Sequence, residues 1–242
     1  MNPTAINTLR EREHRGWSVT LAILATVMST AAMCTAQALQ RGISVELAPT
    51  RNALPMPDAD NEDSLIVTVT DNGGVYLGVD PIALDALGER IRGHLSDPKQ
   101  QFYLKGDARS PYADVLKVLQ VARGVGTEWP ILLTGQHESP GRKGWDPPEG
   151  LQVRVGRPPT SGLAPTVISV LDTGHRFPTL EINDNRTPWA TLQSTLAQFL
   201  RNLDKRVVLV KADGALPFAQ VVHVVDVCRA AGSDDVWVSQ EP

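Results

Sequence analysis

The chain has 242 residues, with 23 lysines and arginines against 27 aspartates and glutamates, and a formal net charge of −4. This length is enough for one or two domains, and the mildly acidic balance excludes the basic stripe of a nucleic-acid-binding protein. Two cysteines exclude a disulfide framework. Five scattered histidines form no zinc-binding pattern. The composition therefore indicates a folded protein with no cofactor and no nucleic-acid partner.

Residues 16–40 form the first predicted element, because they carry no charged side chain and are mostly hydrophobic. About 20 such residues cross a bilayer as an α-helix. The arginines lie mainly before this stretch, and the side richer in Lys and Arg stays in the cytoplasm. The sequence thus predicts a cytoplasmic tail at 1–15 and a single transmembrane anchor helix at 16–40, with the rest of the chain on the other side of the membrane. A cleaved signal peptide is the alternative, since residues 36–38 read Ala-Gln-Ala, an A-x-A-like cleavage site.

Small side chains recur at every fourth position of this anchor. Small residues let membrane helices approach each other closely, so the stripe is a candidate packing face. Chance is the alternative, because the whole segment is rich in small residues. No ionisable side chain lies within 16–40, which means that the segment encodes no intramembrane proton relay. The stripe consists of Ser18, Ala22, Thr26, Thr30, Cys34 and Ala38.

The rest of the chain contains an internal repeat. Residues 105–126 align without a gap on residues 211–232, and nine of the 22 positions are identical. Such self-similarity predicts two copies of one structural unit. We expect a first domain at 43–136, a linker at 137–150 that is rich in turn-forming residues, and a second domain at 151–242.

Each copy is predicted to contain the same series of elements: strand, loop, strand–turn–strand, helix, strand, helix and strand. Alternating strands and helices with one apolar stripe predict an α+β fold of two tandem two-layer sandwiches, each with two helices on one face of a mixed sheet. The aligned segment with nine identical positions is predicted to be a helix that begins at a proline and ends at a glycine. The expected ranges are 43–47, 65–69, 84–95, 101–104, 111–126 and 131–134 in the first copy, and 151–155, 167–171, 192–200, 206–210, 217–232 and 236–239 in the second.

Polar residues near two strand ends are the candidate functional side chains of the soluble part. Loops at strand ends commonly bind ligands, but an aspartate there also favours turns and helix caps, and the second interpretation is the stronger. No phosphate-binding loop or catalytic nucleophile motif occurs, and Cys228 is expected to be buried in a helix face. The sequence therefore predicts no enzyme. The candidates are Lys105, Asp107, Tyr112, Lys211 and Asp213.

The anchor is followed by I-S-V-E-L-A-P-T, then V-T-V-T-D-N-G-G-V-Y-L-G, and then K-G-D-A-R-S-P-Y-A-D-V-L-K-V-L-Q-V-A-R-G-V-G. This series resembles the ExbD/TolR biopolymer-transport family over residues 17–136, and 151–240 look like a second copy of the family's periplasmic domain. The resemblance implies an inner-membrane subunit of a complex that couples the proton gradient to work in the envelope. The implied partner is an ExbB/TolQ-like multi-span channel subunit, with a TonB-like protein or the cell wall as further candidates.

Two departures from the family pattern qualify this expectation. The family's membrane helix carries an aspartate soon after V-T-P, whereas here Val19 and Thr20 are followed by neither proline nor aspartate. The missing carboxylate position falls near Leu24 or Ala25. The duplication is the second departure, since two copies in one chain can form an internal pseudo-dimer. Two hypotheses follow: an accessory subunit of a proton-driven transport complex, or a non-conducting envelope scaffold that binds a partner.

Overall fold

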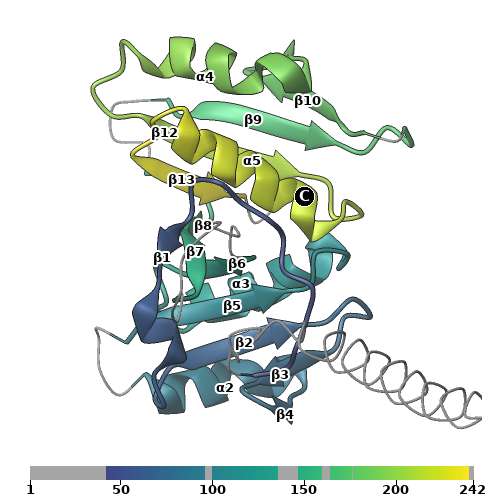
Figure 1. Ribbon diagram of the computed structural model, residues 1–242, viewed down its shortest axis with the longest axis vertical. Coiled ribbons are helices and arrows are strands. Elements are labelled where there is room, and N and C mark those ends of the chain that lie inside the picture. The colour runs from purple at the N-terminus through teal and green to yellow at the C-terminus, as the bar shows by residue number, and fades with distance from the viewer. Residues whose placement is uncertain (1–41, 96–99, 136–146, 160–163, 176, 240–242) are drawn as a thin grey trace, which may run out of the picture. The chain divides into compact units, whose positions relative to one another are not determined.

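The computed structural model describes residues 42–95, 100–135, 147–159, 164–175 and 177–239. The expected anchor at 16–40 lies outside these ranges. Within them, no helix combines the length and the apolar character that crossing a membrane requires. Two mixed sheets and four α-helices make up the described part of the chain (Figure 1).

The first sheet contains seven strands in the order β1-β7-β6-β5-β2-β3-β4. Its centre is parallel, because β5 pairs in parallel with both β2 and β6, while β3, β4, β1 and β7 add antiparallel edges. The strands are β1 (Leu54–Pro55), β2 (Leu65–Val69), β3 (Val75–Leu77), β4 (Asp80–Pro81), β5 (Phe102–Gly106), β6 (Ile131–Thr134) and β7 (Glu149–Gln152).

The second sheet contains six strands in the order β11-β10-β9-β12-β13-β8. Here β12 pairs in parallel with β9 and β13, so β9, β12 and β13 occupy the places that β2, β5 and β6 occupy in the first sheet. From its second strand onward, the predicted series of elements therefore recurs in both halves. The strands are β8 (Arg154–Val155), β9 (Thr166–Leu171), β10 (Thr179–Ile182), β11 (Asn185–Arg186), β12 (Val207–Ala212) and β13 (Asp235–Val238).

Two α-helices accompany each sheet, as expected. They are α2 (Leu84–His94) and α3 (Tyr112–Gly124) in the first half, and α4 (Leu192–Leu200) and α5 (Phe218–Ala230) in the second. Pro111 and Pro217 precede α3 and α5 directly. Gly126 and Gly232 follow the same helices with positive φ, the conformation that glycine adopts most easily at a helix C-terminus.

Alternate residues of the central strands face the helices. Val67 and Leu104 are fully buried in the large core that also contains helix residues such as Leu87 and Val118. The opposite face of the first sheet has a smaller core, which Ala59 covers from the short 3-10 helix η2 (Pro57–Asp60). Both faces of β2 and β5 are thus buried, which explains why four of the five residues of β2 are apolar.

Two of the expected strands do not form as predicted. Residues 43–47 form no strand, because Glu46 bonds to a turn: its N–H donates to the Asp107 carboxylate and its C=O accepts from the Ala108 N–H. The strand expected at 151–155 is divided between the two sheets, with β7 antiparallel to β6 and β8 parallel to β13. The expected boundary between linker and second domain, at 150/151, therefore falls within β7.

Candidate functional site

The two halves meet at the N-termini of α3 and α5 through reciprocal backbone hydrogen bonds. Tyr112 donates its N–H to the Leu216 C=O at 2.8 Å, and Phe218 donates its N–H to the Ser110 C=O, also at 2.8 Å. Each of these residues is the counterpart of another in the repeat alignment, so one bond is the image of the other. This is the pattern of an isologous contact, in which a surface pairs with its own copy.

A second reciprocal pair extends the contact. Ala113 donates to the Gly214 C=O at 2.9 Å, and Ala219 donates to the Ala108 C=O at 3.0 Å. The first N–H groups of a helix have no partner within the helix, and neither α3 nor α5 has a side-chain cap. Each half therefore supplies the missing acceptors for the other half's helix.

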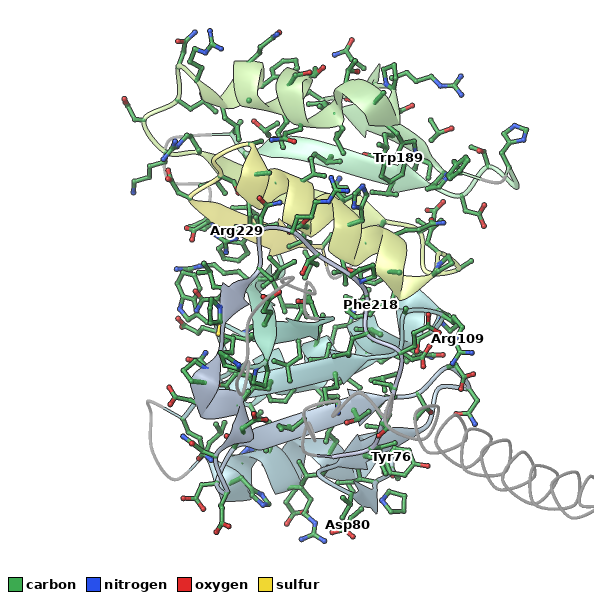
Figure 2. All side chains as sticks on the ribbon, viewed as in Figure 1. Tyr76, Asp80, Arg109, Trp189, Phe218 and Arg229 are labelled. Carbon is green, nitrogen blue, oxygen red and sulfur yellow. The ribbon has the colours of Figure 1, made fainter. Side chains whose placement is uncertain are left out.

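The Phe218 ring packs directly on the backbone at the end of β5 (Figure 2). A Cβ atom at Gly106 would overlap with carbon atoms of this ring. Phe218 is 1 % exposed, so the ring has no free space into which it can move. Glycine at position 106 is consequently a requirement of the contact between the halves.

Asp107, a sequence candidate, organises a turn at this contact. Its carboxylate accepts from the Glu46 N–H at 3.2 Å, and from the backbone N–H and Nε of Arg109, both at 3.0 Å. The hydrogen bond from Arg109 is the main reason that the pKa of Asp107 lies below its usual range, and it outweighs the effect of burial. Arg109 also lies 3.4 Å from the carboxylate of Asp71. The geometry is that of a turn acceptor, the stronger of the two interpretations.

Asp213, the counterpart of Asp107, has a similar but simpler role. Its carboxylate accepts from the Asp172 N–H at 2.6 Å, and its own N–H donates to the Val170 C=O. Asp213 thus joins the end of β12 to the loop that follows β9, whereas the Asp107 carboxylate joins the end of β5 to the segment that precedes β1.

The other three candidates occupy different environments. Lys105 is buried on the small-core face of the first sheet, and burial lowers its pKa while nearby Asp60 opposes that shift. Its counterpart Lys211 is exposed. The Tyr112 hydroxyl is buried without a hydrogen-bond partner among the described residues, and burial raises its pKa. The structure therefore brings Asp107 and Tyr112 to the contact between halves and places the two lysines in unlike settings.

Sequence reasoning missed Asp226, which joins the two halves through a single carboxylate. This side chain on α5 is 3 % exposed. It accepts from the N–H groups of Arg51 and Asn52 at 3.1 and 2.8 Å, and from Asn52 Nδ2 at 3.2 Å. One available signal was an acidic residue within the apolar stripe of the helix. The carboxylate fixes the segment that leads from the N-terminal part of the chain into β1.

A cation–π stack also joins the halves. The Arg154 guanidinium lies 3.3 Å from the ring centroid of Trp129 and 5.2 Å from that of Trp237. Arg229 adds a further connection, because its Nη2 donates to the Gln152 C=O in β7. No sequence motif predicted these contacts, because the residues that make them are distant in sequence.

Some expectations cannot be located in the described structure. The small-residue stripe of the expected anchor lies outside the described residues, as do Leu24 and Ala25; the stripe comprises Ser18, Ala22, Thr26, Thr30, Cys34 and Ala38. Within the described ranges, no cluster of three metal-ligating side chains occurs. Cys228 is fully buried, and burial raises the pKa of its thiol to about 12.

These observations define a class of protein: a two-lobed α+β protein in which buried polar groups such as Asp107 and Asp226 serve turns and the contact between lobes. The chain belongs to the family of biopolymer transport proteins ExbD/TolR, whose model matches residues 18–136 and 147–242. The two matched segments are consistent with a duplicated domain. Family membership implies an accessory role in biopolymer transport, not catalysis, and an association with the inner membrane. A search of curated proteins gives no match.

Proposed function

We propose that the chain is the inner-membrane accessory subunit of an ExbB/TolQ-type, proton-driven transport complex. The family match supports this proposal, because it begins at residue 18 and so includes most of the uncharged segment 16–40. In this arrangement the anchor packs against a multi-span channel subunit, and residues 43–242 extend into the periplasm towards a TonB-like protein or the cell wall.

The anchor of such a subunit acts as a tether. A side chain that carries protons through hydrocarbon must be able to ionise there, and neither Leu24 nor Ala25 can do so. The titrating groups then reside on the channel subunit. The stripe from Ser18 to Ala38 provides the face on which the anchor helix packs closely against the channel subunit, so that movements of the channel are passed to the anchor.

A non-conducting envelope scaffold is the second candidate function. The observation that favours it is the absence of any Asp, Glu, Lys, Arg or His between residues 16 and 40. The scaffold would keep the paired soluble lobes near the membrane and bind a partner without energy transduction.

Purification of the full chain from membranes, followed by proton-flux measurements in liposomes, tests the proposal. We expect a multi-span partner to co-purify and proton flux to require both proteins. A complex without flux would support the scaffold, and the absence of any multi-span partner would contradict the transport role.

Variants of the anchor test the packing stripe within that complex. Replacing Thr26 and Thr30 by leucine should release the partner, because bulk on the stripe prevents close approach of helices. Val27→Leu and Ala31→Leu add similar bulk away from the stripe and serve as the matched control. Equal release by both pairs would contradict the stripe as the contact face.

Orientation is tested separately with spheroplasts. Protease added outside should degrade the soluble lobes if residues 43–242 lie in the periplasm. Full protection of these residues would contradict the proposed topology. A soluble product that begins at Leu39 would indicate cleavage of a signal peptide.

A further inference from the structure

The hairpin of β3 and β4 ends in an exposed apolar side chain. Gly78 and Val79 form its tip, because Leu77 pairs with Asp80 across the two strands. Val79 is 66 % exposed, the highest exposed fraction of any large hydrophobic residue that the structure describes. Leu54 is almost as exposed, but it lies on β1 at the opposite edge of the sheet. The tip therefore presents an apolar contact of its own, separate from Leu54.

The turn itself does not need a valine at this position. Gly78 takes a positive φ of +62°, and a two-residue hairpin turn of this kind requires glycine at its first position. Val79, the second residue of the turn, has no positive φ. Turns between strands usually carry polar residues or glycine. The exposed valine thus has no local role in the turn, and its side chain is free to contact a partner.

The second half of the chain has the same hairpin with a polar tip. The strands β10 and β11 occupy in the second sheet the place that β3 and β4 occupy in the first. They are joined by Asn183 and Asp184, because Ile182 pairs with Asn185. Both turn residues are exposed. An apolar tip therefore occurs in one copy only, and this is the copy that follows the predicted anchor.

The apolar tip lies beside the point where the described chain begins. A Cβ atom at Gly42 would lie 3.1 Å from the Gly78 carbonyl oxygen, so the two backbones are in contact. The Gly78 N–H donates to the Ile66 C=O of β2 at 2.9 Å, which fixes the tip to the sheet. Gly42 is two residues after Gln40, the end of the uncharged segment, and two residues span at most about 7 Å. In the proposed topology, the tip is therefore within reach of the periplasmic surface of the inner membrane.

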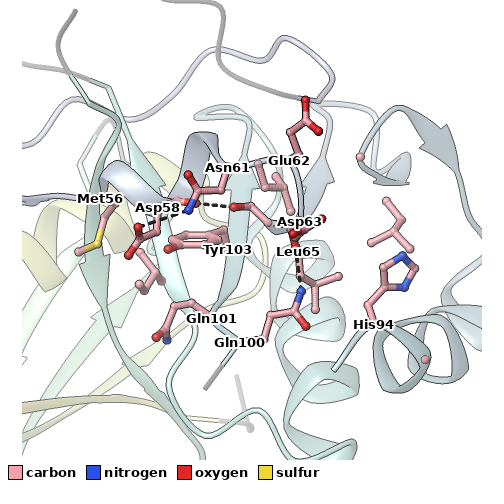
Figure 3. A pocket seen from close by; sticks show the side chains of 16 residues that line it. Met56, Asp58, Asn61, Glu62, Asp63, Leu65, His94, Gln100, Gln101 and Tyr103 are labelled. Carbon is pink, nitrogen blue, oxygen red and sulfur yellow. Dashed lines mark hydrogen bonds between the residues drawn. The ribbon is translucent and has the colours of Figure 1, made fainter. Parts of the chain in front are cut away.

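A polar cavity borders the same hairpin and limits how deeply the tip can enter a membrane. Its volume is about 980 Å³, and Leu77 and Gly78 line part of it. Figure 3 shows the carboxylates of Asp58, Glu62 and Asp63 along its wall, and all three residues are exposed. Carboxylates are costly in hydrocarbon, so this wall has to remain in water or among the lipid headgroups. Apolar contact with a membrane is thereby restricted to the tip.

We propose that the β3–β4 tip is a membrane contact, in which the Val79 side chain enters the boundary between lipid headgroups and acyl chains. The contact rests on the proposed function, because it requires the anchor at 16–40 to cross the membrane. Burial of an apolar side chain in hydrocarbon is favourable, and the anchor holds the tip at a high effective concentration near the lipid. One apolar side chain suffices for lipid, whereas a stable protein interface buries a much larger area on each partner. A contact point beside the anchor gives the soluble part a preferred orientation on the membrane.

The test follows the tip with a fluorophore on the full chain in liposomes. The label is attached to Asp80→Cys, next to Val79, and part of the lipid carries a quencher at the level of the headgroups. Asn185→Cys, at the equivalent position of the second hairpin, carries the control label. Both variants also contain Cys34→Ser, so that only the introduced thiol reacts, because Cys228 is fully buried. The label at position 80 should be quenched several times more strongly than the label at position 185, and its emission should shift to shorter wavelength.

Substitution of the valine then identifies the contact. With the label at position 80, Val79→Asn should reduce quenching to the level seen at position 185, because a polar side chain is unfavourable in hydrocarbon. Leu54→Asn, at an equally exposed apolar position on the opposite edge of the sheet, is the matched control and should leave quenching unchanged. Both positions are exposed, so folding should be retained.

Equal quenching at positions 80 and 185 would overturn the membrane contact, and so would unchanged quenching in Val79→Asn. A shift of emission that appears only after the channel subunit is added would also overturn it, and would assign the tip to a protein partner. Flotation of the same liposomes separates this contact from the proposed function. A chain that does not float with the liposomes contradicts the anchor and the contact together, whereas a floating chain with equal quenching contradicts the contact alone.

Discussion

Single carboxylates hold together parts of this chain that are far apart in sequence. Asp226 and Asp107 are both buried, and both accept backbone N–H groups. A buried carboxylate is tolerated when several donors compensate for its lost hydration. Removal of its charge therefore affects the segment that it binds as well as the residue itself.

Asp226→Asn should lower the free energy of unfolding by about 2 kcal/mol, since hydrogen bonds to a charged acceptor are each worth about 1.5–3 kcal/mol. The amide keeps the shape of the side chain but directs an NH₂ group at the N–H donors of Arg51 and Asn52. Urea denaturation of the two proteins measures the difference. Asp204→Asn, at an exposed site, should change stability little, and a similar loss there would contradict the specific role of Asp226.

Asp107 should make stability depend on acid pH. Its pKa is lower in the folded protein than in the unfolded chain, mainly because of the hydrogen bond from Arg109. The stabilisation is thus complete above the ordinary aspartate pKa of about 4 and is lost as the pH falls through the lower folded value. Denaturation at pH 7 and near pH 2 should show that Asp107→Asn costs stability at pH 7 and much less in acid. An equal cost at both values would contradict this linkage.

At the scale of elements, the N-termini of α3 and α5 depend on each other. Helix starts normally obtain acceptors from a local side-chain cap, but here the turn before each helix supplies them to the other. The approach is close enough that β5 must end in a residue without a Cβ atom, where the Phe218 ring lies. The two helices should therefore be lost together when this contact is disturbed.

Gly106→Ala should destabilise the protein by about 2 kcal/mol, in the range typical of overpacked cores. The added methyl group overlaps with the Phe218 ring. Thermal unfolding measures the loss, and Phe218→Leu should restore part of it in the double variant. Gly93→Ala is the matched control, because its Cβ would meet open space within α2, and it should be neutral or slightly stabilising. Absence of a loss in Gly106→Ala would contradict the close packing.

At the scale of the whole molecule, the surface that pairs one lobe with another is already occupied within the chain. The reciprocal bonds around Pro111 and Pro217, which form an antiparallel bridge, leave no equivalent donors for a second chain. A protein with two such lobes needs no partner copy to complete this contact.

Light scattering should therefore report a monomer for residues 43–242. Residues 43–136 alone lack both the partner lobe and β7, so their exposed helix N-terminus and the uncovered edge of β6 should cause dimerisation or aggregation. The same measurement on both fragments provides the comparison. A stable dimer of the longer fragment would contradict internal pairing.

Most helices and central strands could be predicted from the pattern of apolar residues along the chain. Leu65–Val69 matches β2 residue for residue, and the apolar period of 84–95 gave α2, because burial of one face dictates such patterns directly. The nine-identity repeat predicted two similar halves for the same reason: similar patterns bury similar faces. Asp107 was expected to act as a turn or helix-cap acceptor, because its residue type and its place after a strand favour that role.

The way in which the two halves are joined could not be predicted from any local sequence pattern. The division of 149–155 between two sheets depends on which strand edges are free after folding, and an alternating pattern is compatible with either sheet. Asp226 bonds to Arg51 and Asn52 across 174 or more positions of sequence. Such contacts depend on the relative placement of elements, which the periodicity of a single segment does not encode.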